Sequence, residues 1–136
     1  MPADPRIARL VVRAPNWLGD VVLALPATAA IRRHFPDAAI TVAAPPPVAA
    51  VFRETTIAAP DDVLELPSGT RAACAALRSG RFDAGILLPN SFRSAWQFYR
   101  AGTRERWGYA TAGRGLLLTR RSSRAPGRHR NWRLTC

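Results

Sequence analysis

Short apolar runs alternate along the chain with segments whose apolar residues recur at helical spacing. The apolar runs cover residues 7–13, 39–43, 62–66 and 83–88 and end at proline, glycine or polar residues. Continuous apolar runs of this kind are typical of strands buried on both faces. The helical patterns cover residues 19–34, 48–53, 71–79 and 91–100. The pattern therefore predicts strands and helices in strict alternation.

Two of the predicted helices carry signals for their ends or their shape. Pro26 lies inside the first helix and should kink it. Thr70 can cap the third helix, and Gly80 can end it in the left-handed conformation. The first helix should bury a wide face on a sheet. That face comprises Val21, Val22, Leu25, Thr28, Ala29, Ile31 and Phe35.

Alternating strands and helices joined by short loops predict parallel βαβ units and hence an α/β, Rossmann-like parallel sheet. We expect one such domain over residues 1–119. Ligands of these sheets bind beyond the carboxyl ends of the strands, at the point where the strand order reverses. This rule favours two loops, Ala14–Asp20 after the first strand and Pro89–Arg93 after the fourth.

Composition narrows the class of protein. The 136 residues allow one folded domain, and 48% hydrophobic residues indicate a core rather than disorder. Met1–Arg6 lack the features of a signal peptide, and no apolar stretch is long enough to cross a membrane. Cys74 and Cys136 lie far apart without the spacing of a metal site, which favours a reducing cytoplasm.

Charge is distributed unevenly. The net charge is +11, and all 20 basic residues are arginine. Residues 1–100 contain eleven arginines and eight acidic residues, whereas residues 101–136 contain nine arginines and one acidic residue. Residues 120–136 combine this basicity with no apolar period, so we expect a disordered basic tail.

Three segments, in order, resemble one known family. Residues 13–20 read R-A-P-N-W-L-G-D and precede Pro26, residues 88–95 read L-P-N-S-F-R-S-A, and residues 106–109 read R-W-G-Y with an apolar run at 114–118. These motifs resemble the lipopolysaccharide heptosyltransferases of glycosyltransferase family 9, particularly the type that adds the second core heptose. The resemblance covers residues 7–119 and corresponds to the N-terminal part of that family only.

The resemblance implies a fold and an activity. It implies the N-terminal half of a GT-B glycosyltransferase, which holds the lipopolysaccharide inner-core acceptor, while ADP-heptose would be held by a C-terminal domain missing from this chain. The implied reaction transfers heptose with inversion and needs no metal or cofactor. It takes place at the cytoplasmic face of the inner membrane, with peripheral membrane contact. This chain alone is then expected to be inactive.

By resemblance, Asp20 is the catalytic general base. A carboxylate at a helix start stays ionised near neutral pH and can accept a proton from an attacking sugar hydroxyl. The alternative is that Asp20 only stabilises the helix through its dipole. The surrounding motif makes the catalytic interpretation the better one.

The remaining candidates are substrate-binding residues, each with a structural alternative. Asn16 can cap the helix or contact the acceptor, Trp17 can be a core residue or a sugar platform, and Gly19 can permit close backbone approach or simply form a turn. Arg13 and Arg93 can pair with acceptor carboxylates or phosphates, or remain solvated. Asn90 and Ser91, at a helix start, can bind anions or only cap the helix.

The sequence argues against several other classes of enzyme. The sequence lacks GxxxxGK[ST], HExxH and GxSxG motifs. A small basic nucleic-acid-binding protein is the alternative, suggested by the charge and four tryptophans, although no nucleic-acid partner is expected from the resemblance. The tail itself is either a basic arm for nucleic acid or anionic membrane, or a truncated or out-of-frame end. We favour the second interpretation because the resemblance fades there.

Overall fold

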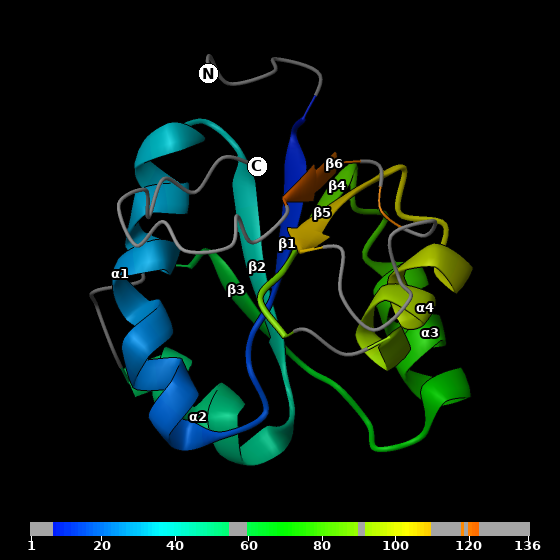
Figure 1. Cartoon of the computed structure of the whole chain (residues 1–136), viewed down its shortest axis with the longest axis horizontal. Helices are drawn as coiled ribbons and strands as arrows, with labels where there is room; N and C mark the ends of the chain where they lie inside the picture. The colour runs from blue at the N-terminus through cyan, green and yellow to red at the C-terminus, as the bar shows by residue number, and fades with distance from the viewer. Residues whose placement is uncertain (1–6, 55–59, 90–91, 110–117, 119, 123–136) are drawn as a thin grey trace.

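A computed structural model describes residues 7–54, 60–89, 92–109, 118 and 120–122. All strand pairs in it are parallel, and they form one sheet in the order β3-β2-β1-β4-β5-β6 (Figure 1). This is the order of a Rossmann sheet, so the predicted fold class is confirmed. The strands are β1 (Arg9–Arg13), β2 (Ala39–Ala44), β3 (Asp62–Glu65), β4 (Ala84–Leu87), β5 (Glu105–Tyr109) and β6 (Arg120–Ser122).

The four predicted strands and four predicted helices are all present, with ends within two residues of those expected. The helices are α1 (Leu18–His34), α2 (Pro46–Glu54), α3 (Thr70–Ser79) and α4 (Phe92–Arg100). The helix α2 begins earlier than predicted because proline is well accommodated in a first helical turn. The sequence had indicated residues 106–109 as a motif but not as a strand.

The strand β6 corrects the predicted end of regular structure at residue 119. Its backbone pairs with β5, with Trp107 opposite Arg120 and Tyr109 opposite Ser122. Backbone pairing at a sheet edge needs no apolar period, which is why charged residues can form this strand. Residues 123–136, where most of the predicted tail lies, are outside the described residues.

The sheet separates two hydrophobic cores because successive strand residues point to opposite faces. Leu10 and Val12 of β1 belong to the core beneath α1 and α2, whereas Val11 belongs to the core beneath α3 and α4. Figure 1 shows α1 and α2 on one side of the sheet and α3 and α4 on the other. By the same alternation, Arg13 lies on the face covered by α3 and α4.

The buried face of α1 is narrower than the sequence predicts. Val21, Thr28 and Ile31 are buried, but Val22 is 57% exposed, so its predicted burial is wrong. Val22 lies one residue, and thus about 100°, around the helix from Val21, which turns it towards solvent. The helix is continuous through Pro26.

Both predicted signals at the ends of α3 are corrected. The residue before the helix is Gly69, without a side-chain cap, and Thr70 is already helical. Gly80 is right-handed, with a φ of −73°, and the left-handed residue is Arg81, with a φ of 50°. Glycine is still needed at position 80, because a Cβ there would lie 2.3 Å from the ring of Phe82.

A second glycine controls how closely α4 approaches the sheet. A Cβ at Gly85 of β4 would lie 2.4 Å from the ring of Phe98, a fully buried residue of α4. The helix can therefore pack against β4 only where a side chain is missing. None of the helices in the described ranges is long and apolar enough to cross a bilayer.

Candidate functional site

The carboxyl ends of β1 and β4 lie side by side, as predicted. In the parallel pair β1–β4, Val12 faces Ile86 and Arg13 faces Leu87. The strand order reverses between these two strands, since β2 and β3 lie beyond β1, and β5 and β6 lie beyond β4. The loops that leave β1 and β4 therefore meet at the topological switch point, where ligands of open α/β sheets bind.

Arg13, the last residue of β1, is a buried cation. It is 8% exposed, so it is not the solvated arginine of the alternative interpretation. Its guanidinium donates hydrogen bonds to the carbonyl of Ala14 and, over 2.7 Å, to Oδ1 of Asn16. Its Nε is buried and has no hydrogen-bond partner in the described residues. The fold thus keeps a charge out of water with only partial compensation.

Arg93, in the first turn of α4, is the second cation at this edge. Its Nε donates to Oγ1 of Thr70 over 3.1 Å, and its Nη2 donates to the carbonyl of Ser68. Burial, and then the nearby charge of Arg93, lower the pKa of Arg13 to about 10. Arg13 consequently remains protonated at neutral pH, and the two guanidiniums raise the local positive potential together.

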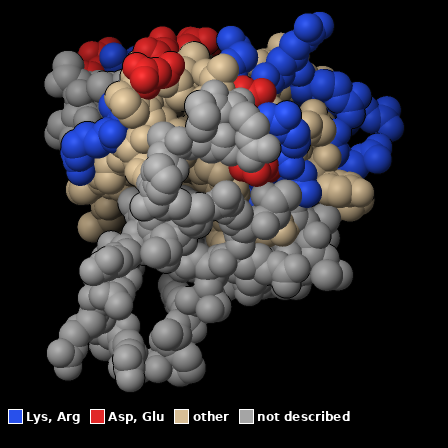
Figure 2. Space-filling view, turned by 90° about the horizontal axis from the view of Figure 1, so that it is seen from above, with Lys and Arg blue, Asp and Glu red and all other residues tan. Residues whose placement is uncertain are grey.

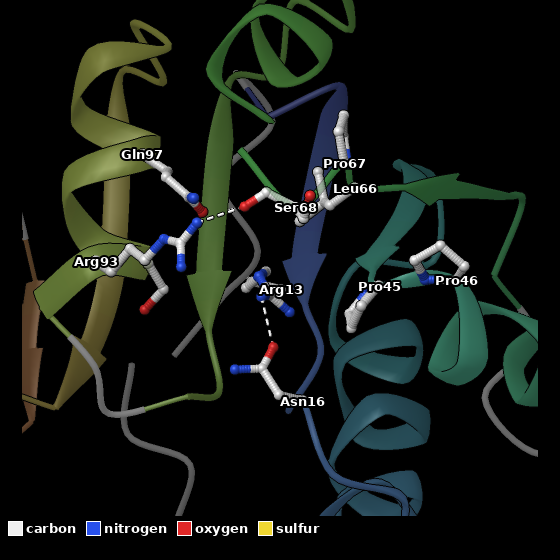
Figure 3. Close-up of a pocket in the computed structure, with 10 residues that line it drawn as sticks. Arg13, Asn16, Pro45, Pro46, Leu66, Pro67, Ser68, Arg93 and Gln97 are labelled. Carbon is white, nitrogen blue, oxygen red and sulfur yellow. Dashed lines mark hydrogen bonds between the residues drawn. The ribbon is translucent and has the colours of Figure 1, made fainter. Parts of the chain in front are cut away.

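These arginines line a pocket of about 350 Å³. Figure 3 shows Arg93 and Gln97 reaching from α4 towards the loop that holds Ser68, with Arg13 between them and Pro45. The lining contains no acidic residue. It comprises Arg13, Asn16, Pro45, Pro46, Leu66, Pro67, Ser68, Arg93, Ser94 and Gln97.

The pocket is therefore suited to an anion. Guanidinium groups pair strongly with carboxylate and phosphate oxygens, and an anion here would offset the unfavourable burial of Arg13. The first turn of α4 also lines the pocket, and the start of a helix attracts negative charge. Ser68, Ser94 and Gln97 add polar groups that could orient such a ligand.

The other residues predicted from the first loop lie outside this pocket lining. Asp20 is exposed in the first turn of α1 and does not line the pocket. Trp17 is 75% exposed and is the N-cap residue, so it is not a core aromatic. The helix cap is therefore not Asn16, whose side chain binds Arg13 instead.

Packing within the described residues does not require glycine at position 19. A Cβ built there meets no atom within 4 Å, because the residue faces open space at the start of α1. Asn90 and Ser91 lie outside the described residues. Their roles in binding the acceptor stay predictions, as do the catalytic role of Asp20 and the binding roles of Trp17 and Gly19.

The sequence missed the contributions from the loops after β2 and β3. Pro45 follows β2, Ser68 follows β3, and both line the pocket. The rule that nominated the loops after β1 and β4 could have found them, because all parallel strands end at the same edge of the sheet. Gln97 carried no signal of its own, since its place in the pocket depends on how α4 packs.

No group of three or more His, Cys, Asp or Glu side chains that could hold a metal ion is found in the part of the chain that the structure describes. The expectation of a metal-independent reaction is not tested by this observation and stays a prediction.

The sequence is similar to one known protein family. Residues 70–135 match the model described as glycosyltransferase family 9 (heptosyltransferase). Over 108 residues, 74% of this chain, the sequence is 31% identical to lipopolysaccharide heptosyltransferase 2 of Escherichia coli K12. The predicted resemblance to glycosyltransferase family 9 is confirmed, and it extends to residue 135, beyond the predicted limit at residue 119. The match spans 31% of that relative's length, so this heptosyltransferase-like chain corresponds to about a third of it.

Solved heptosyltransferase structures share the fold. The structure of E. coli ADP-heptose lipopolysaccharide heptosyltransferase II matches with a TM-score of 0.72 and 26% identity, over 86% of this chain and 34% of that chain. The E. coli heptosyltransferase WaaC with ADP-2-deoxy-2-fluoro heptose matches with a TM-score of 0.70 and 21% identity, over 89% of this chain and 44% of that chain. The second likeness shows the fold alone.

Proposed function

We propose that this chain supplies the acceptor-binding part of a family 9 heptosyltransferase. Its acceptor is an anionic glycolipid of the lipopolysaccharide inner core, its donor is ADP-heptose, and the transfer inverts the anomeric centre without a metal or cofactor. The protein works at the cytoplasmic face of the inner membrane. The observation that carries the proposal is the acid-free pocket of Arg13 and Arg93 at the switch point of the sheet.

The pocket supports an anionic acceptor on electrostatic grounds. Arg13 is desolvated, and its charge has no carboxylate partner among the described residues. Arg93 is held by oxygens of Ser68 and Thr70, which accept hydrogen bonds but carry no full charge. A phosphate or carboxylate of the acceptor would give both guanidiniums a negatively charged hydrogen-bond partner. The names of the relatives, which refer to lipopolysaccharide and ADP-heptose, agree with this chemistry.

Asp20 is proposed as the general base. It lies seven residues after Arg13, in the first turn of α1, and its carboxylate is open to solvent. In the proposed step the acceptor hydroxyl oxygen bonds to the anomeric carbon, and its proton passes to Asp20. The bond from that carbon to the ADP oxygen breaks, and ADP leaves with the electron pair. The pocket would hold the acceptor while its hydroxyl reaches the carboxylate.

The test of this function is a chimera. Residues 7–109 replace the aligned part of E. coli lipopolysaccharide heptosyltransferase 2, and transfer of heptose from ADP-heptose to an inner-core glycolipid is measured. We expect turnover by the chimera. In it, Asp20→Asn should lower kcat by about a hundredfold or more, because general-base catalysis contributes about that much. KM for the acceptor should change little, because Asp20 does not line the pocket.

Binding of the acceptor by the chain itself provides the matched control. Isothermal titration with the inner-core glycolipid should give similar dissociation constants for the wild-type chain and for Asp20→Asn, and weaker binding for Arg93→Gln. A folded chimera without transfer, together with no glycolipid binding by the chain, would contradict the proposed function.

A further inference from the structure

The outer surface of α4 carries an exposed aromatic pair beside an arginine. Trp96 and Tyr99 are 39% and 48% exposed, and Arg100 is exposed in the last turn. Spacings of three and four residues place them on one side of the helix. We call Trp96, Tyr99 and Arg100, with Arg78 of the neighbouring α3, the aromatic–arginine face. The helices α3 and α4 lie on the flank of the molecule away from α1 and α2 (Figure 1).

The positive charge of this flank is not balanced by acidic residues of the same two helices. The helices α3 and α4 contain four arginines and no acidic residue. Nη2 of Arg78 donates to the carbonyl of Arg100 over 2.7 Å, which holds the side chain without neutralising it. Figure 2 shows basic side chains gathered on the flank where α3 and α4 lie, with acidic side chains towards the other flank and at the inner border of the basic group. Asp83, which lies between the two helices in the sequence, accepts hydrogen bonds from the backbone of Ala8 and Arg9. Glu105, the first acidic residue after α4, belongs to β5.

The aromatic rings are already stacked and covered by cations. The ring centres of Trp96 and Tyr99 lie 5.9 Å apart at 29°. The guanidinium of Arg100 lies 5.9 Å from the centre of the Trp96 ring, and that of Arg106 lies 5.3 Å from the centre of the Tyr99 ring. A base-stacking platform for nucleic acid needs open ring faces. Exposed rims of Trp and Tyr beside arginines suit the headgroup region of a bilayer.

We propose that the aromatic–arginine face docks on the surface of an anionic phospholipid bilayer. The arginines are attracted to the negative headgroups, and the rims of Trp96 and Tyr99 enter the interface. The proposal deepens the proposed function, because a glycolipid acceptor resides in a membrane, but it requires no transfer activity. The exposed apolar residues at the start of α1 are a poorer match, since Asp20 lies among them and the first arginine of that helix is Arg32.

The experiment is co-sedimentation of the full chain with vesicles that contain no inner-core glycolipid. One set is phosphatidylcholine alone, and in the other phosphatidylglycerol makes up about a third of the lipid. We expect binding to the anionic vesicles only, weakening as salt rises. Arg100→Gln should weaken it about fivefold, in line with roughly 1 kcal/mol for each basic residue at such a surface. Trp96→Ala should weaken it several-fold at every salt concentration.

Two control variants match these changes on the other flank. Arg33→Gln removes an exposed arginine from the last turn of α1, and Leu23→Ala removes an apolar side chain that is 80% exposed on the same helix. Each should change vesicle binding by less than about twofold, because neither residue belongs to the proposed docking face. Circular dichroism confirms that every variant is folded.

Several results would overturn the proposal. They are equal binding to both vesicle types, equal losses for Arg100→Gln and Arg33→Gln, loss through Leu23→Ala instead of Trp96→Ala, or full retention of binding by Arg100→Gln and Trp96→Ala. Binding to a mixed-sequence oligonucleotide without binding to vesicles would favour nucleic acid as the partner. Loss of glycolipid transfer by the chimera with vesicle binding intact would refute the proposed function alone.

Discussion

The two flanks of the sheet hold their arginines in different ways. On the flank of α1, α2 and β3, guanidiniums meet carboxylates: Arg32 pairs with Asp61, and Arg53 pairs with Glu65 over 2.6 Å. On the flank of α3 and α4, three arginines donate side-chain hydrogen bonds to neutral oxygens. Arg93 binds the Ser68 carbonyl and Thr70, Arg78 binds the Arg100 carbonyl, and Arg9 binds the Gly80 carbonyl over 2.8 Å.

The difference separates two uses of the same residue type. An arginine paired with a carboxylate contributes a local contact and little outward field. An arginine held by a carbonyl is just as well positioned, but its charge is still available to an incoming anion. The chain, which has no lysine, thus uses arginine for structure on one flank and for a positive field on the other.

The largest expected effect comes from removing the buried charge. Arg13→Met should weaken binding of the inner-core glycolipid by about tenfold to a hundredfold, because a charged hydrogen bond contributes roughly 1.5–3 kcal/mol. Stability should not fall, because burial disfavours this cation in the folded state. Calorimetry measures the first quantity and urea unfolding the second. Equal affinities for the variant and the wild type would remove Arg13 from the site.

The pKa of Arg13 gives this prediction a pH dependence. Its folded-state pKa, about 10, lies below the ordinary pKa of arginine in an unfolded chain. The unfolded chain therefore binds the proton more tightly, so the charge destabilises the fold at neutral pH and this effect diminishes as pH rises through about 10. Any stability advantage of Arg13→Met should accordingly shrink above pH 10. An advantage that grows with pH would contradict the assignment.

A smaller effect is expected on the paired flank at Asp61. The backbone N–H of Ile40 and then the Arg32 guanidinium hold the pKa of this carboxyl below its usual range. Its stabilisation should therefore be present above the unfolded pKa of about 3.9 and be lost as pH falls through the folded pKa. Asp61→Ala should cost about 1 kcal/mol at pH 7 in urea unfolding, and less below about pH 4. The exposed Asp37→Ala is the control.

The smallest effect is expected at the exposed pair of Arg53 and Glu65, whose side chains are each about half exposed. Arg53→Gln should lower the free energy of unfolding by less than about 0.5 kcal/mol, and high salt should reduce the difference further. Thermal unfolding at low and high salt measures it. A loss above about 1 kcal/mol would mean that this flank depends on its ion pairs more than exposed pairs usually contribute.

The sequence predicted the elements well because they depend on local patterns. Apolar runs and helical spacing gave the first four strands and all four helices, and the alternation gave the parallel sheet. The predicted loops after β1 and β4 do meet at the switch point. These predictions needed only the period of the apolar residues and the general rules for parallel sheets.

The wrong predictions concern residues whose roles depend on how the helices pack against the rest of the fold. Nothing in the sequence distinguishes Val21 from Val22, and only the docking of α1 leaves the second exposed. Thr70 has the side chain of a cap, yet it serves as an acceptor for Arg93, which is 23 residues away. Gly80 looked like a left-handed helix end, but it is needed for the space occupied by the Phe82 ring. Such roles arise from contacts between distant segments.

The packing of Phe98 against Gly85 affects the pocket, although neither residue lines it. Phe98 and Arg93 belong to the same short helix, so the depth at which the ring packs against β4 also determines where the Arg93 guanidinium lies relative to Arg13. A methyl group at position 85 would force the Phe98 ring to shift, and a shift of the helix would change the position of Arg93 relative to Arg13. The relative position of the two guanidiniums thus depends on the absence of a side chain at one residue of β4.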